Sequence, residues 1–305
     1  MIALSTCLLL LLGTPALAHG LGETGGGPTW TLGRWTFDPG VLSLLLASGG
    51  LYLSGTVRLW QRAGFGRGIG AAQAACFWTG WLCAALALIS PLHWFSERVF
   101  VAHMAEHTLL IAVAAPLIAL GCPTRAAAWG SPKSVSTGIA HLLRHRAMAA
   151  LWRGLTDPFV ATAVQGIVLW MWHMPRLYDL ALGNLIVHRL QHLSFSLAAV
   201  LFWWALLRAR RPGVAVFCLF VTALHTSLLG LLLTLSTRLW YPPQVEFVAA
   251  WGLAPLEDQQ LAGLVMWVPM GVIYTIAGLW FAARWITSTH GDIPLRMPAA
   301  SERPV

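Results

Sequence analysis

Long runs of apolar residues, separated by short polar stretches, cover most of the chain. A transmembrane helix needs about 20 consecutive, mostly apolar residues. Applied along the sequence, this criterion predicts seven membrane spans, at residues 37–60, 70–92, 99–120, 156–174, 185–207, 213–236 and 259–283. The composition agrees, because 57% of the residues are hydrophobic and only 10% are charged, which excludes an ordinary soluble domain. The predicted fold class is therefore all-α, a polytopic membrane helical bundle with about seven transmembrane helices.

The first 18 residues differ from these spans. A leucine-rich run, Leu8 to Leu12, is followed by Ala16-Leu17-Ala18, which matches the A-x-A cleavage pattern of a secretory signal. The stretch carries no Lys or Arg, so an uncleaved eighth span is the alternative. The expected organisation is a signal peptide at 1–18, an external Gly-rich segment at 19–36, a seven-helix membrane domain at 37–286 and a disordered cytoplasmic tail at 287–305.

Basic residues indicate the orientation of the predicted bundle. The formal net charge is +8, and the loops after the first, third and fifth spans are rich in Arg and Lys, whereas the loops between them are not. By the positive-inside rule the basic loops face the cytoplasm, which puts the N-terminus outside and the C-terminus inside. Topology and contact with the lipid bilayer then account for the basic excess, and no nucleic-acid partner is expected.

A histidine pair occurs twice, at corresponding places in two predicted spans. His103 and His107 flank Glu106, and His188 and His192 flank Gln191. Residues four apart lie above one another on a helix, so each pair presents its ring nitrogens on one face. Imidazole is costly in hydrocarbon without a partner, which makes histidines inside spans functional candidates. The pattern predicts a metal site, with Glu106 and Gln191 supporting its ligands.

Other polar and sulfur-bearing side chains are expected in the same half of the membrane. The predicted topology places the histidines of the spans in the outer half, where His93 borders the second span as an interfacial or site residue. The further candidate ligands are His173, His225, Asp258, Met174 and Met266, and Gln259 is a candidate supporting residue. The cysteines show no C-x-x-C or other chelating spacing, so neither a disulfide framework nor a thiolate metal site is indicated.

The donor types leave two cofactors open. Histidine and methionine donors suit copper, and a mature N-terminal His19 would add a further chelating group. Haem held by two histidines is the alternative, because pairs on two helices can hold haem between spans. His103-x-x-Glu106-His107 also fits the H-x-x-E-H pattern of zinc proteases, but the second copy has Gln191 in place of the general base. A ligand set duplicated without its base favours binding over hydrolysis.

Several ordered stretches are similar to a known family. These are His103–His107 running into Ala115–Pro123, Trp172–Leu182, His188–Phe195, Phe202–Trp204, Leu224–Gly230 and Asp258–Pro269. Over about residues 37–285 the chain resembles the polytopic cytochrome c oxidase assembly factors labelled CtaG. The resemblance implies a multi-pass protein of the bacterial inner (plasma) membrane that matures a haem-copper oxidase by helping copper reach it. One departure is Glu106, where the resemblance leads us to expect glutamine more often.

These observations converge on a non-catalytic membrane assembly factor with a copper site facing the periplasm. Its expected partners are haem-copper oxidase subunits and, upstream, periplasmic copper chaperones. Two rivals remain at this stage: a haem-binding membrane redox protein, and a proton-coupled transporter in which the histidines and Glu106 relay protons. The lack of a clear inverted repeat argues against the transporter.

Overall fold

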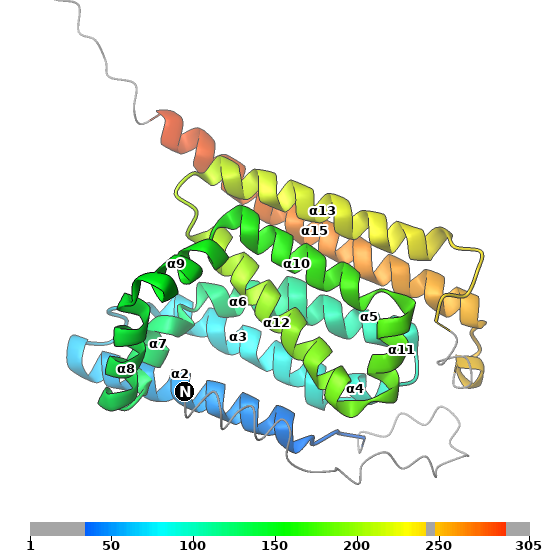
Figure 1. The fold of residues 1–305 in the computed structure, drawn as a ribbon, viewed down its shortest axis with the longest axis horizontal. Helices are drawn as coiled ribbons and strands as arrows, with labels where there is room; N and C mark the ends of the chain where they lie inside the picture. Colours follow the sequence, from blue (N-terminus) through cyan, green and yellow to red (C-terminus); the bar gives the residue numbers. More distant parts are fainter. Residues whose placement is uncertain (1–33, 242–247, 291–305) are drawn as a thin grey trace, which may run out of the picture.

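The computed structural model describes residues 34–241 and 248–290. Within these ranges the chain is helical and contains no strand, which confirms the predicted fold class. The long helices run side by side as a bundle (Figure 1). The expected signal peptide, most of the Gly-rich segment and the tail from residue 291 onward lie outside the described residues. Apolar helix faces that do not pack on one another cover much of the surface, as a bilayer protein requires.

Six helical segments are long and apolar enough to cross a membrane. They are α2 (Pro39–Ala63), α3 (Ala71–Ile89), the continuous segment Phe100–Leu120, α12 (Leu185–Leu207), α13 (Pro212–Leu235) and α15 (Pro255–His290). The remaining span expected from sequence corresponds to α10 (Pro158–Trp172), which has only 15 residues. It is short because the chain turns after Trp172 into a new helix that begins at Pro175. Helix α15 continues past residue 286, where we expected the membrane domain to end.

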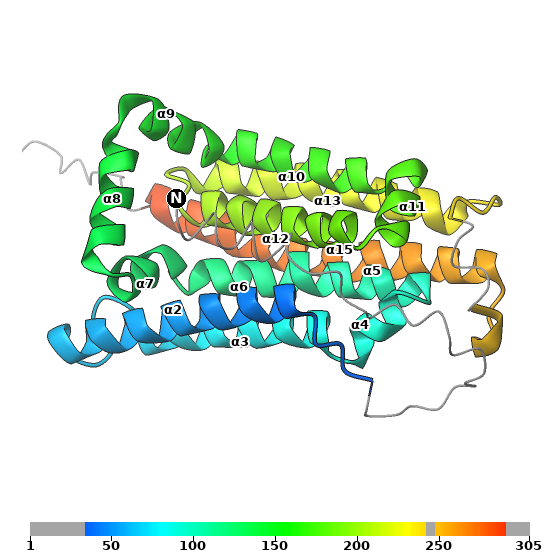
Figure 2. The ribbon, with the colours of Figure 1, turned by 60° about the horizontal axis from the view of Figure 1, so that its bottom comes forward.

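Short helices occupy the two ends of the bundle. At one end lie α4 (Pro91–Ser96) and α11 (Pro175–Gly183), and at the other lie α7 (Pro123–Gly130), α8 (Lys133–Arg144) and α9 (Arg146–Leu155) (Figures 1 and 2). The 3-10 turn Ala249–Trp251 precedes α15. Helices α8 and α9 bury none of their residues, and the chain bends between them at His145, whose backbone is extended.

Local sequence signals explain where many helices begin. Proline stands in the first turn of α2, α4, α7, α10, α11 and α13, where its missing N–H would have no helical partner in any case. The side chains of Asp38, Ser90, Asp157 and Asn184 accept hydrogen bonds from free N–H groups at the starts of α2, α4, α10 and α12. These starts are therefore encoded within a few residues of sequence.

Glycine permits close approach at one helix contact in particular. Helix α2 packs on α7, and Gly55 of α2 faces the backbone of that helix. A Cβ atom at Gly55 would overlap the carbonyl oxygen of Ala126. Because the obstacle is backbone rather than a flexible side chain, no larger residue fits at this position without moving α7.

The third span is irregular directly after its histidine pair. Helix α5 (Phe100–Thr108) passes into a π-helical turn, Leu109–Ala114, and then into α6 (Ala115–Leu120). The indole Nε1 of Trp203 on α12 donates a hydrogen bond to the carbonyl oxygen of Ile111 at 3.1 Å. Such π turns change the register of a helix and are frequent at functional sites. Trp203 thus stabilises the turn that follows His107.

Candidate metal centre

Five histidines and one carboxylate meet where α4, α5 and α12 converge. His93 comes from α4, and His188 and His192 come from α12. Helix α5 supplies His103, Glu106 and His107. We call these six residues the histidine cluster. It lies near the end of the bundle that carries α4 and α11, away from α7, α8 and α9 (Figure 2).

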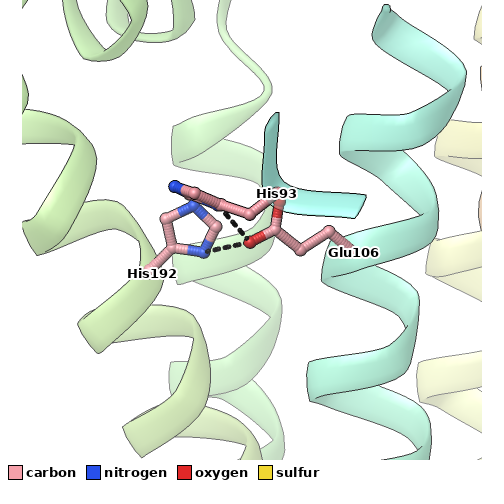
Figure 3. A group of neighbouring side chains, drawn as sticks. All are labelled: His93, Glu106 and His192. Carbon is pink, nitrogen blue, oxygen red and sulfur yellow. Dashed lines mark hydrogen bonds and ion pairs between the residues drawn. The ribbon is translucent and has the colours of Figure 1, made fainter. Parts of the chain in front are cut away.

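Glu106 lies at the contact between the three elements. Its Oε1 atom is 2.9 Å from Nδ1 of His93 and 3.8 Å from Nδ1 of His192. Figure 3 shows both rings on the same side of the carboxylate. One donor atom from each of these residues lies within 4.8 Å of the other two, a spacing that can hold a metal ion. Glu106 is fully buried, and a negative charge there would need compensation by these rings or by a cation.

His93 lies on a short helix between two membrane spans. Burial acts to lower the pKa of His93, but the nearby charge of Glu106 raises it, and the net pKa lies above the ordinary value of 6.5. The direction agrees with the 2.9 Å contact between Nδ1 of this ring and the carboxylate. A proton on His93 and a metal ion beside Glu106 would be alternative ways to balance the same negative charge.

The second sequence pair forms a stacked unit on α12. The rings of His188 and His192 lie 4.6 Å apart at an interplanar angle of 15°, and their Nε2 atoms are 2.7 Å apart. A hydrogen bond between two Nε2 atoms needs a proton on one of them and a lone pair on the other. The ring of His192 also lies 5.1 Å from that of His107, so the unit contacts the α5 pair.

The histidine pair on α5 is buried more deeply than the pair on α12 and has fewer hydrogen-bond partners. The rings of His103 and His107 lie 4.3 Å apart, and both side chains are buried. Nδ1 of His103 is 3.3 Å from the carbonyl oxygen of Ser96, which can only accept, so the shared hydrogen belongs to Nδ1. Nε2 of His103 and both ring nitrogens of His107 have no hydrogen-bond partner within the described part of the chain. Such orphaned polar atoms are costly when buried, and the lone pair of a neutral ring can bind a metal ion.

His173 stands beside the cluster but is separated from it. Its Nδ1 donates to the carbonyl oxygen of Leu169 at 2.7 Å, and its Nε2 has no hydrogen-bond partner among the described residues. The ring of Phe195 lies 4.7 Å from His107 and 6.2 Å from His173. Phe195 therefore lies next to both rings. Within the described residues, His173 makes no ring contact with the histidines of α5 or α12.

Asp258 and Gln259 make structural contacts instead of joining the cluster. The two carboxylate oxygens of Asp258 accept from the backbone N–H groups of Phe100 and Val101 at 2.8 and 2.9 Å. A residue of α15 thereby caps the start of α5, which has no capping side chain of its own. Gln259 accepts from the backbone N–H of Trp240 and donates to the carbonyl of Arg238.

The other candidate residues differ in exposure and in their surroundings. Met174 is 56% exposed, and Met266 is part of the main hydrophobic core. His225 lines an apolar groove of about 460 Å³ between α10 and α13. Its ring packs against Gly166 of α10, where an added Cβ would lie 3.4 Å from Nε2. Gln191 is buried, and its Oε1 has no hydrogen-bond partner within the described ranges.

His93 is the cluster member that our set of candidate ligands omitted. The sequence predicts that His93 borders the second span, but the helix of that span ends at Ile89 and His93 lies on the next helix. The signal for a new helix is local: Ser90 caps it and Pro91 opens it. This turn directs the short helix back over α5, which brings His93 to Glu106.

Replacing Asp258 by alanine is expected to lower the free energy of unfolding by about 1–2 kcal/mol, because loss of a helix cap typically costs about that much. It should also disturb the position of His103, since the capped turn leads directly to that residue. Unfolding in mild detergent with increasing SDS measures the first effect. Asp258→Asn keeps one acceptor oxygen and should fall between wild type and Asp258→Ala. Equal stability of all three would contradict the capping role.

Comparison with known proteins gives one match. Residues 50–288 match the family model described as "Cytochrome c oxidase caa3 assembly factor (Caa3_CtaG)". The matched range contains the whole histidine cluster and the helices that hold it. Curated proteins and solved structures gave no match.

Proposed function

The chain belongs to the cytochrome c oxidase caa3 assembly factor family, and from this premise we propose that it binds copper at the histidine cluster and passes it to the oxidase. The oxidases implied by the resemblance contain haem and copper, so an assembly factor must help insert one of these or fold the subunits around them. The donor set of the cluster favours the metal ion. Copper is then a cargo that the protein receives and releases.

The observation that carries the proposal is the state of the buried ring nitrogens. His103 and His173 each donate Nδ1–H to a backbone carbonyl, which leaves a lone pair on Nε2. Metal-binding histidines commonly make this same arrangement, because the second hydrogen bond fixes the ring and its tautomer. The ring nitrogens of His103 and His107 that have no hydrogen-bond partner are buried, as is the side chain of Glu106 on the same helix. Imidazole is a good ligand for copper in either oxidation state.

The distribution of charge supports a site on the periplasmic side of the inner membrane. The stretch that includes α7, α8 and α9, residues 123–155, contains five basic residues and no acidic one: Arg125, Lys133, Arg144, Arg146 and Arg153. Basic loops stay in the cytoplasm. The opposite end of the bundle, near which the cluster lies, would then face the periplasm, where oxidase copper sites and copper chaperones would be accessible.

Copper transfer of this kind requires no chemical transformation, so we propose a non-catalytic role. Met174 is exposed whereas His103 and His107 are buried, and exchange among imidazoles is the simpler route. A cluster with more donors than one ion uses can hand an ion from one ligand to the next. The receiving partner would be a haem-copper oxidase subunit docked at the cluster end, and periplasmic chaperones would supply the metal.

The test compares copper content in proteins purified from copper-supplemented cells. Wild-type protein should retain copper, and His107→Ala/His192→Ala, which removes one ring from each helix, should lose most of it. His141→Ala/His145→Ala is the matched control, since these two histidines are also four apart but exposed on α8 and at its end. Wild-type copper no higher than that of the first variant would refute the proposal.

An absorbance spectrum of the same wild-type sample separates copper from haem. A colourless or copper-only preparation agrees with the proposal, whereas a strong Soret band that disappears in His107→Ala/His192→Ala would assign the cluster to haem instead.

A further inference from the structure

The six residues of the histidine cluster exceed what one metal ion can use. A tetrahedral metal site takes four donor atoms, and its metal–imidazole bonds are about 2.0–2.1 Å long. The donors of one ion therefore lie within roughly 4 Å of one another. The cluster as a whole is wider than this, because among the described residues only His93, Glu106 and His192 place one donor atom each within even 4.8 Å of one another.

The donors divide into two groups by their contacts. The first, which we call the Glu106 group, contains His93, Glu106 and His192, with one donor atom of each inside a mutual distance of 4.8 Å. The second, the α5 pair, contains His103 and His107, which do not belong to that compact group although they are buried beside it. Their rings contact each other at 4.3 Å and keep nitrogens without hydrogen-bond partners in the described chain.

The α12 unit lies between the two groups. The ring of His188 is 5.9 Å from that of His93 and 5.9 Å from that of His103. His192 belongs to the Glu106 group and its ring is also 5.1 Å from that of His107. A modest rotation of either ring about its side-chain torsions, with loss of the hydrogen bond between their Nε2 atoms, would move a nitrogen from one group toward the other.

We propose that the cluster binds two copper ions, one in the Glu106 group and one at the α5 pair, and that His188 and His192 allow an ion to pass between them. This inference rests on the proposed copper function and specifies the number of ions and the order of their ligands. The charge of Glu106 makes its group the stronger site for a cation. The neutral α5 pair would hold its ion less tightly.

The number of ions is measured by titrating metal-free protein in detergent with Cu(I) under anaerobic conditions, using a coloured Cu(I) chelator as competitor and native mass spectrometry to count bound ions. Wild type should bind two ions. His93→Ala should bind one ion fewer, and so should His103→Ala/His107→Ala. His141→Ala/His145→Ala should still bind two, because those residues lie outside the cluster.

The outcomes separate this inference from the function on which it rests. Saturation of wild type at one ion would overturn the two-ion inference and leave copper binding in place. No binding by wild type would overturn both. Loss of all copper from His93→Ala together with loss of all copper from His103→Ala/His107→Ala would show one shared site. The wild-type count decides the question even if a variant fails to fold.

Discussion

Replacement of Glu106 by glutamine is expected to lower the copper affinity of the Glu106 group roughly 10- to 100-fold, the loss typical when a group that orients or supports a metal ligand is removed. Glutamine keeps the size of the side chain but not its negative charge. The carboxylate oxygen that faces His93 at 2.9 Å and His192 at 3.8 Å would become an amide. Competition with a copper chelator measures the change in affinity.

Glu97→Gln provides a control with the same change in charge. Glu97 caps the end of α4, is partly exposed and pairs with Arg98 at 3.5 Å, so it is outside the cluster. The copper affinity of Glu97→Gln should fall far less than that of Glu106→Gln, because the charge of Glu97 acts on His93 less than that of Glu106 does. An unchanged affinity in Glu106→Gln would mean that the carboxylate does not assist the metal. The resemblance led us to expect glutamine at position 106. Glu106→Gln therefore also measures what glutamate contributes at this position.

Replacement of Gly55 by alanine is expected to destabilise the protein by about 3 kcal/mol or more, at or beyond the upper end of the cost of overpacking a core. The added methyl group would overlap the carbonyl oxygen of Ala126, and α7 would have to move away from α2. The disturbance should reach Tyr52, one turn away, whose hydroxyl donates to the carbonyl of Gly121. The measurement is unfolding in mild detergent, together with the yield of monodisperse protein.

Gly50→Ala is the matched control on the same helix. An added Cβ at Gly50 meets nothing within 4 Å. Because glycine inside a helix is less favourable than alanine by roughly 0.5–1 kcal/mol, this variant should be as stable as wild type or slightly more so. Similar losses in both variants would show that glycine at position 55 serves the flexibility of the helix and not its packing.

Much of the fold follows from properties that act within a short stretch of chain. The length of each apolar run is enough to predict a transmembrane helix, because hydrocarbon leaves the backbone no other way to satisfy its polar groups. The spacing of His103 and His107, and of His188 and His192, places each pair on one helix face regardless of the neighbouring helices. The histidine pairs could therefore be recognised without knowing where their helices lie.

The composition of the site depended on contacts between segments far apart in sequence. Nothing in the sequence near His225 shows that its ring packs against Gly166 of α10 and lines an apolar groove there. Asp258 resembled a ligand, yet it caps α5 across 157 and 158 residues of chain. His93 joined the site because a short helix folds back onto α5. In each case the neighbouring helix, which the local pattern does not specify, determines the role of the residue.

Hydrophobic length and helical periodicity are local quantities, so the chain alone determined its helical membrane architecture and the two histidine pairs. The choice of which helix faces meet was made by close packing, such as Gly80 against Ala114 and Gly263 against Gly230. That packing brought Glu106 close to both His93 and His192 and left Met174 exposed. Only the tertiary structure could decide this, because contact between distant segments depends on shape complementarity over the whole bundle.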